Sequence, residues 1–479
     1  MSNSLRWKTV NGILWSSIER FSSAGINFIT GLIIARLLSP HEYGLMAMLA
    51  IFIAISQSVI DSGFSNALIR KKDRTEKDFS TTFYFNVVVG LLMYAIIYVS
   101  APVIATFYDS PQLIGIARIV GITLLLGSLS IVQQSILTIQ IDFKTQTKIS
   151  LCSVVLSGGV GIIMALMNYG VWALVYQTLS ASFVRTSLLW IVAKWKPSEK
   201  FSKSSFQSLF GYGSKLLMAG ILETVYRNLY SIIIGKFFQS NVLGIYSRGE
   251  QIASYPSSNI TGVIQRVTFP ILSEVQDERD RLLNIFKQTI RVTCFFVFSL
   301  MVYLIVIADP LVRLILTDKW IECVPIIQIL CLSFMWYPVH ILNLNVLQVK
   351  GRSDLFFRIE LIKKVVGLII LFVSIPFGVI SMCWGRVIYC FIELFINMHY
   401  TNVFLHITNL KQLSYVMPLY LYSLLLGAVS IVFCNHIEND ILKIIATFIL
   451  YIAVWMLIVP KIERIDIRNI ILIMKNKSN

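Results

Sequence analysis

The sequence predicts an all-α membrane protein that crosses the bilayer many times. Hydrophobic residues make up 56% of the 479 residues, charged residues only 14%, and the mean hydropathy is +0.74. Soluble domains carry about 25% charged residues, so this chain has too little polar surface for a soluble enzyme. Disordered chains are poor in large apolar residues, whereas this one has 30 phenylalanines. The apolar residues also fall in long continuous runs, which is typical of membrane-spanning helices.

Those runs define the predicted helices, because a spanning helix needs about 20 mostly apolar residues. The runs are continuous and do not alternate in polarity, which favours helices over the strands of a barrel. We expect about 14 transmembrane helices, near residues 11–38, 43–69, 79–107, 112–140, 147–167, 171–193, 207–237, 242–270, 288–308, 322–348, 355–376, 379–402, 414–434 and 440–460.

Basic residues in the loops predict the topology. Alternate loops, counted from the N-terminus, hold 24 Lys and Arg residues, and the other loops hold only Arg313 and Lys319. Positively charged loops stay in the cytoplasm, so both termini are expected there. The net charge of +16 then faces anionic membrane lipids. Nucleic acid is not an expected partner, because no basic run is interleaved with exposed aromatic residues.

An internal repeat divides the chain. Residues 34–45 resemble residues 234–245: each stretch has an apolar helix end, one basic residue, a short turn and a glycine that opens the next helix. A weaker match relates residues 102–104 to residues 310–312. Six helices per repeat give both copies the same orientation, which predicts two parallel six-helix lobes around a central cavity. The predicted parts are residues 1–200 (helices 1–6), 201–410 (helices 7–12) and 411–479 (two extra C-terminal helices and a cytoplasmic tail).

Several short strings resemble a known family. The string Ala35-Arg36-Leu37-Leu38-Ser39-Pro40-His41-Glu42-Tyr43-Gly44 is similar to the helix 1–2 signature of the Wzx-type polysaccharide-export flippases, members of the multidrug/oligosaccharidyl-lipid/polysaccharide exporter (MOP) superfamily. Residues 68–71, 142–144 and 351–354 fit the same resemblance. It implies a MATE-like fold that moves undecaprenyl-diphosphate-linked glycans across the bacterial inner membrane by alternating access. The expected role is in O-antigen, capsule or exopolysaccharide biosynthesis, beside a polysaccharide polymerase and export machinery.

Arginines inside the spans are the candidate diphosphate ligands. Ionisable residues in a membrane are costly and are functional candidates by default, and the guanidinium fork binds phosphate oxygens in pairs. The resemblance implies cavity arginines on helices 1, 2 and 8. Helix 2 departs from that pattern, since it carries Asp61 instead of a mid-span arginine. The candidates for the diphosphate cavity are Arg20, Arg248, Arg266, Arg185 and Arg118.

Acidic residues inside the spans are candidates for coupling transport to Na⁺ or H⁺: Glu223, Asp61 and Glu393. A structural alternative stays open for two of them. Glu223 and Arg227 are spaced i,i+4 and can neutralise each other, and Arg386 and Glu393, spaced i,i+7, can do likewise. Arg266 lies near a span end, where a long side chain can reach the membrane interface.

The function expected from these observations is transport, not catalysis. No non-cytoplasmic loop is long; the largest, residues 309–321, is expected to form at most a short interfacial helix. The chain has no Walker A string, and its cysteines and histidines are dispersed, so we expect no catalytic residues, no metal site and no cofactor other than a coupling ion. A multidrug/cation antiporter of the same superfamily is the alternative, and a membrane glycan polymerase or ligase is a third.

Overall fold

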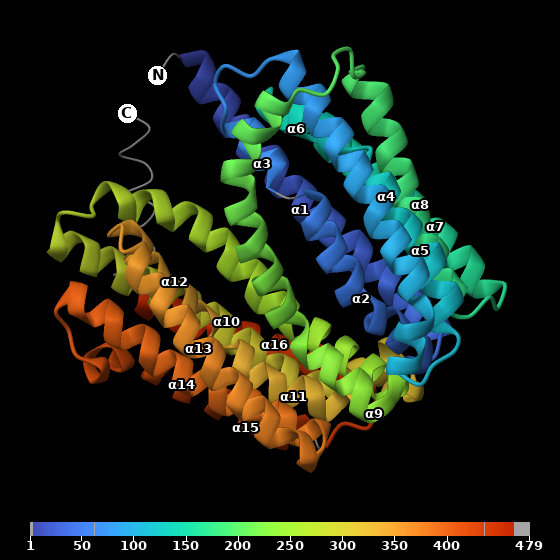
Figure 1. The fold of residues 1–479 in the computed structure, drawn as a ribbon. Helices are drawn as coiled ribbons and strands as arrows, with labels where there is room; N and C mark the ends of the chain where they lie inside the picture. The colour runs from blue at the N-terminus through green and yellow to red at the C-terminus, as the bar shows by residue number, and fades with distance from the viewer. Residues whose placement is uncertain (1–2, 62, 435, 464–479) are drawn as a thin grey trace. The chain divides into compact units, whose positions relative to one another are not determined.

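A computed structural model describes residues 3–61, 63–434 and 436–463. Every regular element in these ranges is a helix (Figure 1), which confirms the all-α prediction. By their contacts the residues form two compact units, Met1–Gly244 and Ile245–Asn479. The predicted lobe boundaries at residues 200 and 410 stay predictions. The basic tail after residue 463 lies outside the described residues.

The helices of the first unit fall where the apolar runs predict them. Two predicted segments are each broken into a long and a short helix, namely α2 with α3 and α5 with α6, and the second pair is bent by 40°. The bounds are α1 (Asn3–Leu37), α2 (Pro40–Asp61), α3 (Phe64–Arg70), α4 (Glu76–Phe107), α5 (Leu113–Ser128), α6 (Ile131–Ile139), α7 (Phe143–Leu166) and α8 (Val171–Ala193).

The long helix α9 (Lys203–Glu274) is two helices joined at Gln239, whose φ of 70° and ψ of 168° are not helical. The break falls between the predicted segments 207–237 and 242–270. The remaining elements are α10 (Arg279–Ile315), η1 (Asp318–Trp320), α11 (Cys323–Phe334), α12 (Tyr337–Val349), α13 (Ser353–Ser374), η2 (Ile375–Phe377), α14 (Val379–Leu405), α15 (Asn409–Cys434) and α16 (Asp440–Glu463). The short 3₁₀ helix η1 lies inside the predicted loop 309–321.

Fewer helices are long and apolar enough to span a membrane than the fourteen spans predicted from the sequence. Among the described residues, seven helical segments are long and apolar enough to cross a membrane, and the bent pair α5–α6 would be an eighth. Helix α13 is not one of them, because it carries Arg358, Glu360, Lys363 and Lys364 along its length. The count of fourteen spans stays a prediction, although each of the fourteen apolar runs forms helix.

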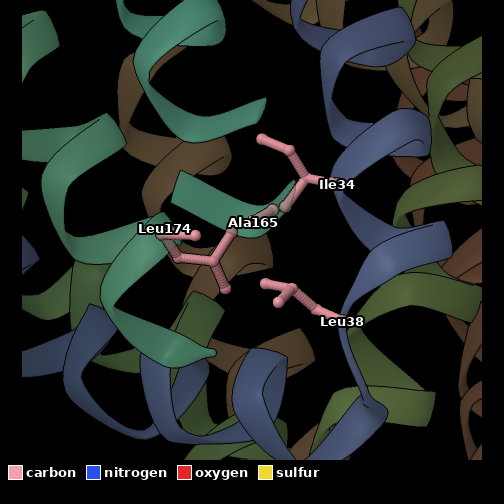
Figure 2. Packing of buried hydrophobic residues seen from close by; sticks show 5 residues of the cluster. Ile34, Leu38, Ala165 and Leu174 are labelled. Atoms are coloured by element: carbon pink, nitrogen blue, oxygen red, sulfur yellow. The ribbon is translucent and has the colours of Figure 1, made fainter. Parts of the chain in front are cut away.

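Small residues bring α1 close to α7 in the first unit. A side-chain carbon on Gly158 would lie 2.6 Å from Thr30 Cγ2, and one on Gly161 would lie 2.8 Å from Ile34 Cδ1. Without a hydrophobic driving force between spans, helices in a membrane depend on this close packing. Figure 2 shows the result: Ile34 and Leu38 lie against Ala165 of α7 and Leu174 of α8.

The two copies of the repeated turn contact each other within the first unit. A Cβ on Gly44 would lie 1.7 Å from the carbonyl oxygen of Ser240, and a Cβ on Gly244 would lie 1.8 Å from that of Pro40. The contact is reciprocal, because each glycine faces the residue four positions before the other. His41 Nδ1 and Ser240 Oγ are 2.5 Å apart across it. The two similar turns, which are 200 residues apart in the sequence, are therefore in direct contact in the structure.

One face of α4 suits lipid. Val88, Leu92, Val99 and Val103 share that face, and Val99 and Val103 are 75% and 70% exposed. Exposed apolar stripes of this length are unusual on soluble proteins. Figure 1 lets the reader follow α4 beside α5, which it contacts. This stripe supports a multi-pass membrane protein.

A cluster of aromatic rings lies in the core of the second unit. The ring of Trp336, just before α12, lies 5.1 Å from Phe298 of α10 and 5.0 Å from Tyr420 of α15, measured between ring centroids. Phe391 of α14 lies 5.6 Å away on another side. Trp336 is 1% exposed. This packing joins α10, α14 and α15 at the residue that precedes α12.

Candidate functional site

A cavity of about 860 Å³ lies within the first unit. Its walls come from α2, α3, α5, α6, α8 and the first part of α9. Small ligands occupy pockets of about 300–1,000 Å³, so this cavity has room for a ligand of several sugar rings or an equivalent drug. It is the candidate functional site.

Helix α2 supplies one polar wall. Ala50, Ala54, Gln57, Ser58 and Asp61 all line the cavity. Their spacings of three and four residues place them on one helix face. The alanines leave room and the three polar residues follow toward the end of the helix. A lipid-facing helix gains nothing from such a face, so this pattern indicates a wet cavity.

Hydroxyl and amide groups dominate the opposite walls. Ser58 Oγ lies 3.2 Å from Thr224 Oγ1, which ties α2 to α9. Gln134 of α6 donates to Gln146 Oε1 at 2.8 Å, and Thr186 of α8 donates to the Leu126 carbonyl at 2.9 Å. Such neutral groups recognise sugar hydroxyls through hydrogen bonds in both directions.

One predicted cation and one predicted anion line this cavity together. Arg185 of α8 is exposed to it, and Asp61 ends α2 at the same cavity. Asp61 accepts a backbone hydrogen bond from Ser65, but its Oδ1 atom is buried with no hydrogen-bond partner among the described residues. The site can therefore bind an anionic group at Arg185 and a cationic or donor group at Asp61.

The other four predicted arginines are not among the residues that line this cavity. Arg20 and Arg266 are exposed on α1 and α9. The Arg118 guanidinium stacks 4.4 Å from the centre of the Tyr98 ring. Arg248 is 8% exposed and donates a hydrogen bond to Gln251. Their role as diphosphate ligands stays a prediction.

The predicted acidic candidates have different partners. Glu223 accepts a 2.7 Å hydrogen bond from Arg227, and both side chains are well exposed, at 45% and 75%. Glu393 pairs with Lys363 at 2.9 Å. Arg386 pairs instead with Glu250 of α9. Arg386 and Glu393 thus each form an ion pair with a residue of another helix, and their pairing with each other, which the i,i+7 spacing allows, stays a prediction.

Sequence reasoning missed two residues that the structure brings to prominence. Lys363 is 2% exposed and His340 is 6% exposed, both in the second unit. Lys363 lies inside the apolar run 355–376, three residues after Glu360. A lysine there was a readable signal, because an ionisable residue within an apolar run is costly. His340 carried the same signal, because it lies inside the apolar run 322–348, but its partners are distant in sequence and could not be named.

The fold of this chain is similar to the folds of solved helical membrane proteins. It matches a lipid II flippase, MurJ, in an inward closed conformation, with a TM-score of 0.76 at 14% identity over 96% of this chain and 100% of that one. It also matches a multidrug resistance MATE family transporter of the MOP superfamily in an inward-facing conformation, with a TM-score of 0.61 at 12% identity over 82% and 98% of the two chains. These likenesses confirm the MATE-like fold.

The sequence places the chain within one family. A model of the family described as "Polysaccharide biosynthesis protein" matches residues 33–325, and the chain belongs to this family. The teichuronic acid biosynthesis protein TuaB of Bacillus subtilis is 29% identical over 74% of each chain. The succinoglycan biosynthesis transport protein ExoT of Rhizobium meliloti is 24% identical over 70% of this chain and 68% of its own.

Proposed function

We propose that this protein is a flippase that moves polyprenyl-diphosphate-linked oligosaccharide repeat units across the bacterial inner membrane by alternating access, and that it acts as a transporter without catalysis. Its family, the names of its relatives and its transporter fold support the proposal. The observation that carries it is the cavity, because hydroxyls, amides and one exposed arginine surround a space of about 860 Å³.

The chemistry of the cavity fits the three parts of such a substrate. Sugar hydroxyls need neutral donors and acceptors, which Gln57, Gln134 and Thr186 offer. A diphosphate needs a cation that stays charged, and Arg185 is the arginine on the cavity wall. The polyprenyl chain needs apolar surface, which Met46, Leu49 and Ile53 of α2 supply on the cavity wall.

A second candidate is a multidrug/cation antiporter of the same superfamily. Asp61 favours it, because this residue lines the cavity and its Oδ1 atom has no hydrogen-bond partner within the part of the chain that the structure describes, so the carboxylate can receive a cationic drug or a donor group. Within one cavity, Asp61 thus favours a cationic substrate and Arg185 favours an anionic one. Removing each charge separately distinguishes the two functions.

Arg185→Ala is expected to lower export of lipid-linked glycan about tenfold, since one charge-assisted hydrogen bond is worth about 1.5 kcal/mol. Arg185→Lys should keep part of the activity, because it retains the charge but not the fork. The measurement is surface polysaccharide, together with cytoplasm-facing lipid-linked units, in cells that depend on this protein. Arg281→Ala, at an exposed pair with Glu278, is the control.

Two results would contradict the flippase. One is full export by Arg185→Ala at normal abundance. The other is efflux of a cationic dye that needs Asp61 but not Arg185, which would identify the antiporter. Accumulation of flipped but unpolymerised units in cells without the protein would indicate a polymerase instead.

We further propose an inner-membrane location with both termini in the cytoplasm and anionic lipids around the basic loops. The distribution of Lys and Arg in the loops supports it. A reporter fused at Asp73, between α3 and α4, should read cytoplasmic, and one at Tyr169, between α7 and α8, should read periplasmic. The opposite reading at either position would contradict the predicted topology. A polysaccharide polymerase and export machinery are the proposed partners downstream.

A further inference from the structure

A basic pocket lies between α10 and α15, within the second unit. It measures about 300 Å³ and is lined by Lys287 and Arg291 of α10 and by Ser414, Tyr415, Pro418 and Leu419 of α15. Lys287 and Arg291 are spaced i,i+4, so both face the pocket from one side of α10. Two cations and an aromatic ring thus meet in a space of the size that small ligands occupy.

Three side chains of this pocket can donate hydrogen bonds to an anion. The Lys287 ammonium lies 5.0 Å from the centre of the Tyr415 ring and forms no ion pair with any residue that the structure describes. Arg291 makes other contacts within the chain, and its five N–H donors allow it to bind a second group as well. The Tyr415 hydroxyl is the third donor. The Ser414 hydroxyl is already used, because it donates to the Lys411 carbonyl at 2.7 Å.

The two helices that form the pocket offer no carboxylate near it. The sequence of α10 has no Asp or Glu between residues 281 and 308, and that of α15 has none between residues 409 and 434. Glu278, just before α10, pairs with Arg281. Lys411, which is exposed on α15, adds a further positive charge one turn before Tyr415. A phosphate has the charge that complements this pocket, because its oxygens accept hydrogen bonds from guanidinium and ammonium groups.

The pocket lies at the depth of the phospholipid headgroups. Lys287 directly precedes the predicted span 288–308, and Ser414 is the first residue of the predicted span 414–434. Arg291 lies one turn inside its span, from where a long side chain can reach the membrane interface. Tyrosine is enriched at the same depth, where Tyr415 lies. The cations of the pocket therefore meet the layer that holds the lipid phosphates.

An apolar stripe leads from the pocket along α15 into the membrane. It begins at the exposed Pro418. The next residues on that face are spaced three or four apart and are each more than half exposed: Leu421, Leu425, Val429 and Val432. Toward α10 the pocket is closed, because the rings of Phe298 and Tyr420 pack there with their centroids 5.8 Å apart. An acyl chain whose headgroup lies in the pocket can therefore follow the stripe of α15.

We propose that this pocket binds one anionic phospholipid of the surrounding bilayer. Its phosphate accepts hydrogen bonds from Lys287, Arg291 and the Tyr415 hydroxyl, and one acyl chain lies along the stripe of α15. Basic pockets between helices on the cytoplasmic side of a membrane recognise such headgroups. A zwitterionic lipid carries the same phosphate together with a positive charge that Lys287 and Arg291 repel, so the pocket selects lipids with a net negative charge. The site is independent of the substrate that the protein transports.

Native mass spectrometry of the full chain in detergent tests this proposal, because it counts the lipids that stay bound. The protein receives equal amounts of phosphatidylglycerol and phosphatidylcholine with the same acyl chains. We expect one phosphatidylglycerol to bind before any second lipid and before phosphatidylcholine. Lys287→Gln and Arg291→Gln should each weaken this binding about tenfold, which is the loss expected for one charge-assisted hydrogen bond.

Matched variants separate the pocket from the general positive charge of the loops. Arg281→Gln removes one cation from an exposed position of the same helix and should leave phosphatidylglycerol binding unchanged. Lys287→Arg keeps the charge and should keep the binding. Tyr415→Phe removes only the hydroxyl and should weaken the binding less than Lys287→Gln does, and it serves as the test if either glutamine variant fails to fold. Equal binding of the two lipids, or equal effects of Arg281→Gln and Lys287→Gln, overturns the proposal.

A photoreactive phosphatidylglycerol locates the bound lipid on the protein. A diazirine in the headgroup should label residues 287–291 or 411–419, and one on the acyl chain should label residues 421–432. Labelling elsewhere overturns the proposal. Competition identifies the class of ligand: if inorganic phosphate displaces the lipid at the same concentration, the pocket binds a soluble anion, and if a polyprenyl phosphate displaces it more effectively than phosphatidylglycerol itself, the pocket binds the carrier lipid. Either result also overturns the proposal.

Discussion

Gly44→Ala is expected to remove most folded protein from the membrane. The added Cβ would lie 1.7 Å from the Ser240 carbonyl oxygen, and 2.9 Å from its Cα. These are backbone atoms, so no side chain can rotate away and one of the two helices must shift. Overpacking a well-packed contact costs about 1–3 kcal/mol and more where the backbone must move. Gly244→Ala should act in the same way, because its Cβ would meet the Pro40 carbonyl at 1.8 Å.

The measurement is membrane abundance together with the thermal midpoint of the detergent-solubilised protein. Gly25→Ala is the matched control, because Gly25 is an exposed glycine within α1 with nothing within 4 Å of the new Cβ. Alanine favours a helix over glycine by about 0.5–1 kcal/mol, so this control should be neutral or slightly stabilising. Normal abundance of both Gly44→Ala and Gly244→Ala would show that the two turns do not make this contact in the membrane.

This contact also shows what the sequence could predict. The match of residues 34–45 with residues 234–245 identified both glycines and the turn before each of them. It could not show that the two turns touch, because similarity between segments carries no information about their distance. The apolar runs did predict the positions of the helices. A continuous apolar run depends only on residues that are neighbours in the sequence, so it indicates a helix without any knowledge of the tertiary structure.

Pairings between helices were beyond the reach of spacing arguments. Spacings of three, four or seven residues identify partners on the same helix, and Glu223 with Arg227 is such a pair. Glu393 and Lys363 are 30 residues apart, and Arg386 and Glu250 are 136 apart. Only the packing of α13 and α9 against α14 decides those partners. For the same reason Asp61 and Arg185, both predicted singly, could not be assigned to one cavity.

Removing one member of the Glu250–Arg386 ion pair is expected to lower the stability of the protein strongly. The Arg386 guanidinium binds the Glu250 carboxylate, donates to the Tyr246 hydroxyl at 3.1 Å and lies 4.7 Å from the centre of the Phe334 ring. Both charged side chains are mostly buried, at 23% and 31% exposure. Breaking a buried pair by removing one partner costs about 3–5 kcal/mol, because the other charge stays behind without compensation.

Arg386→Met alone should therefore destabilise the protein strongly, whereas the double variant Arg386→Met with Glu250→Gln should recover most of the loss. Replacing both members of a buried pair by neutral groups of similar size is often nearly neutral. The thermal midpoint in nanodiscs measures both, with Arg281→Met at an exposed pair as the control. If the double variant is no more stable than Arg386→Met, the stabilisation comes from the contacts of Arg386 with Tyr246 and Phe334. In that case Arg386→Lys, which keeps the charge but loses the planar guanidinium, should be nearly as damaging as Arg386→Met, and the ion pair itself contributes little.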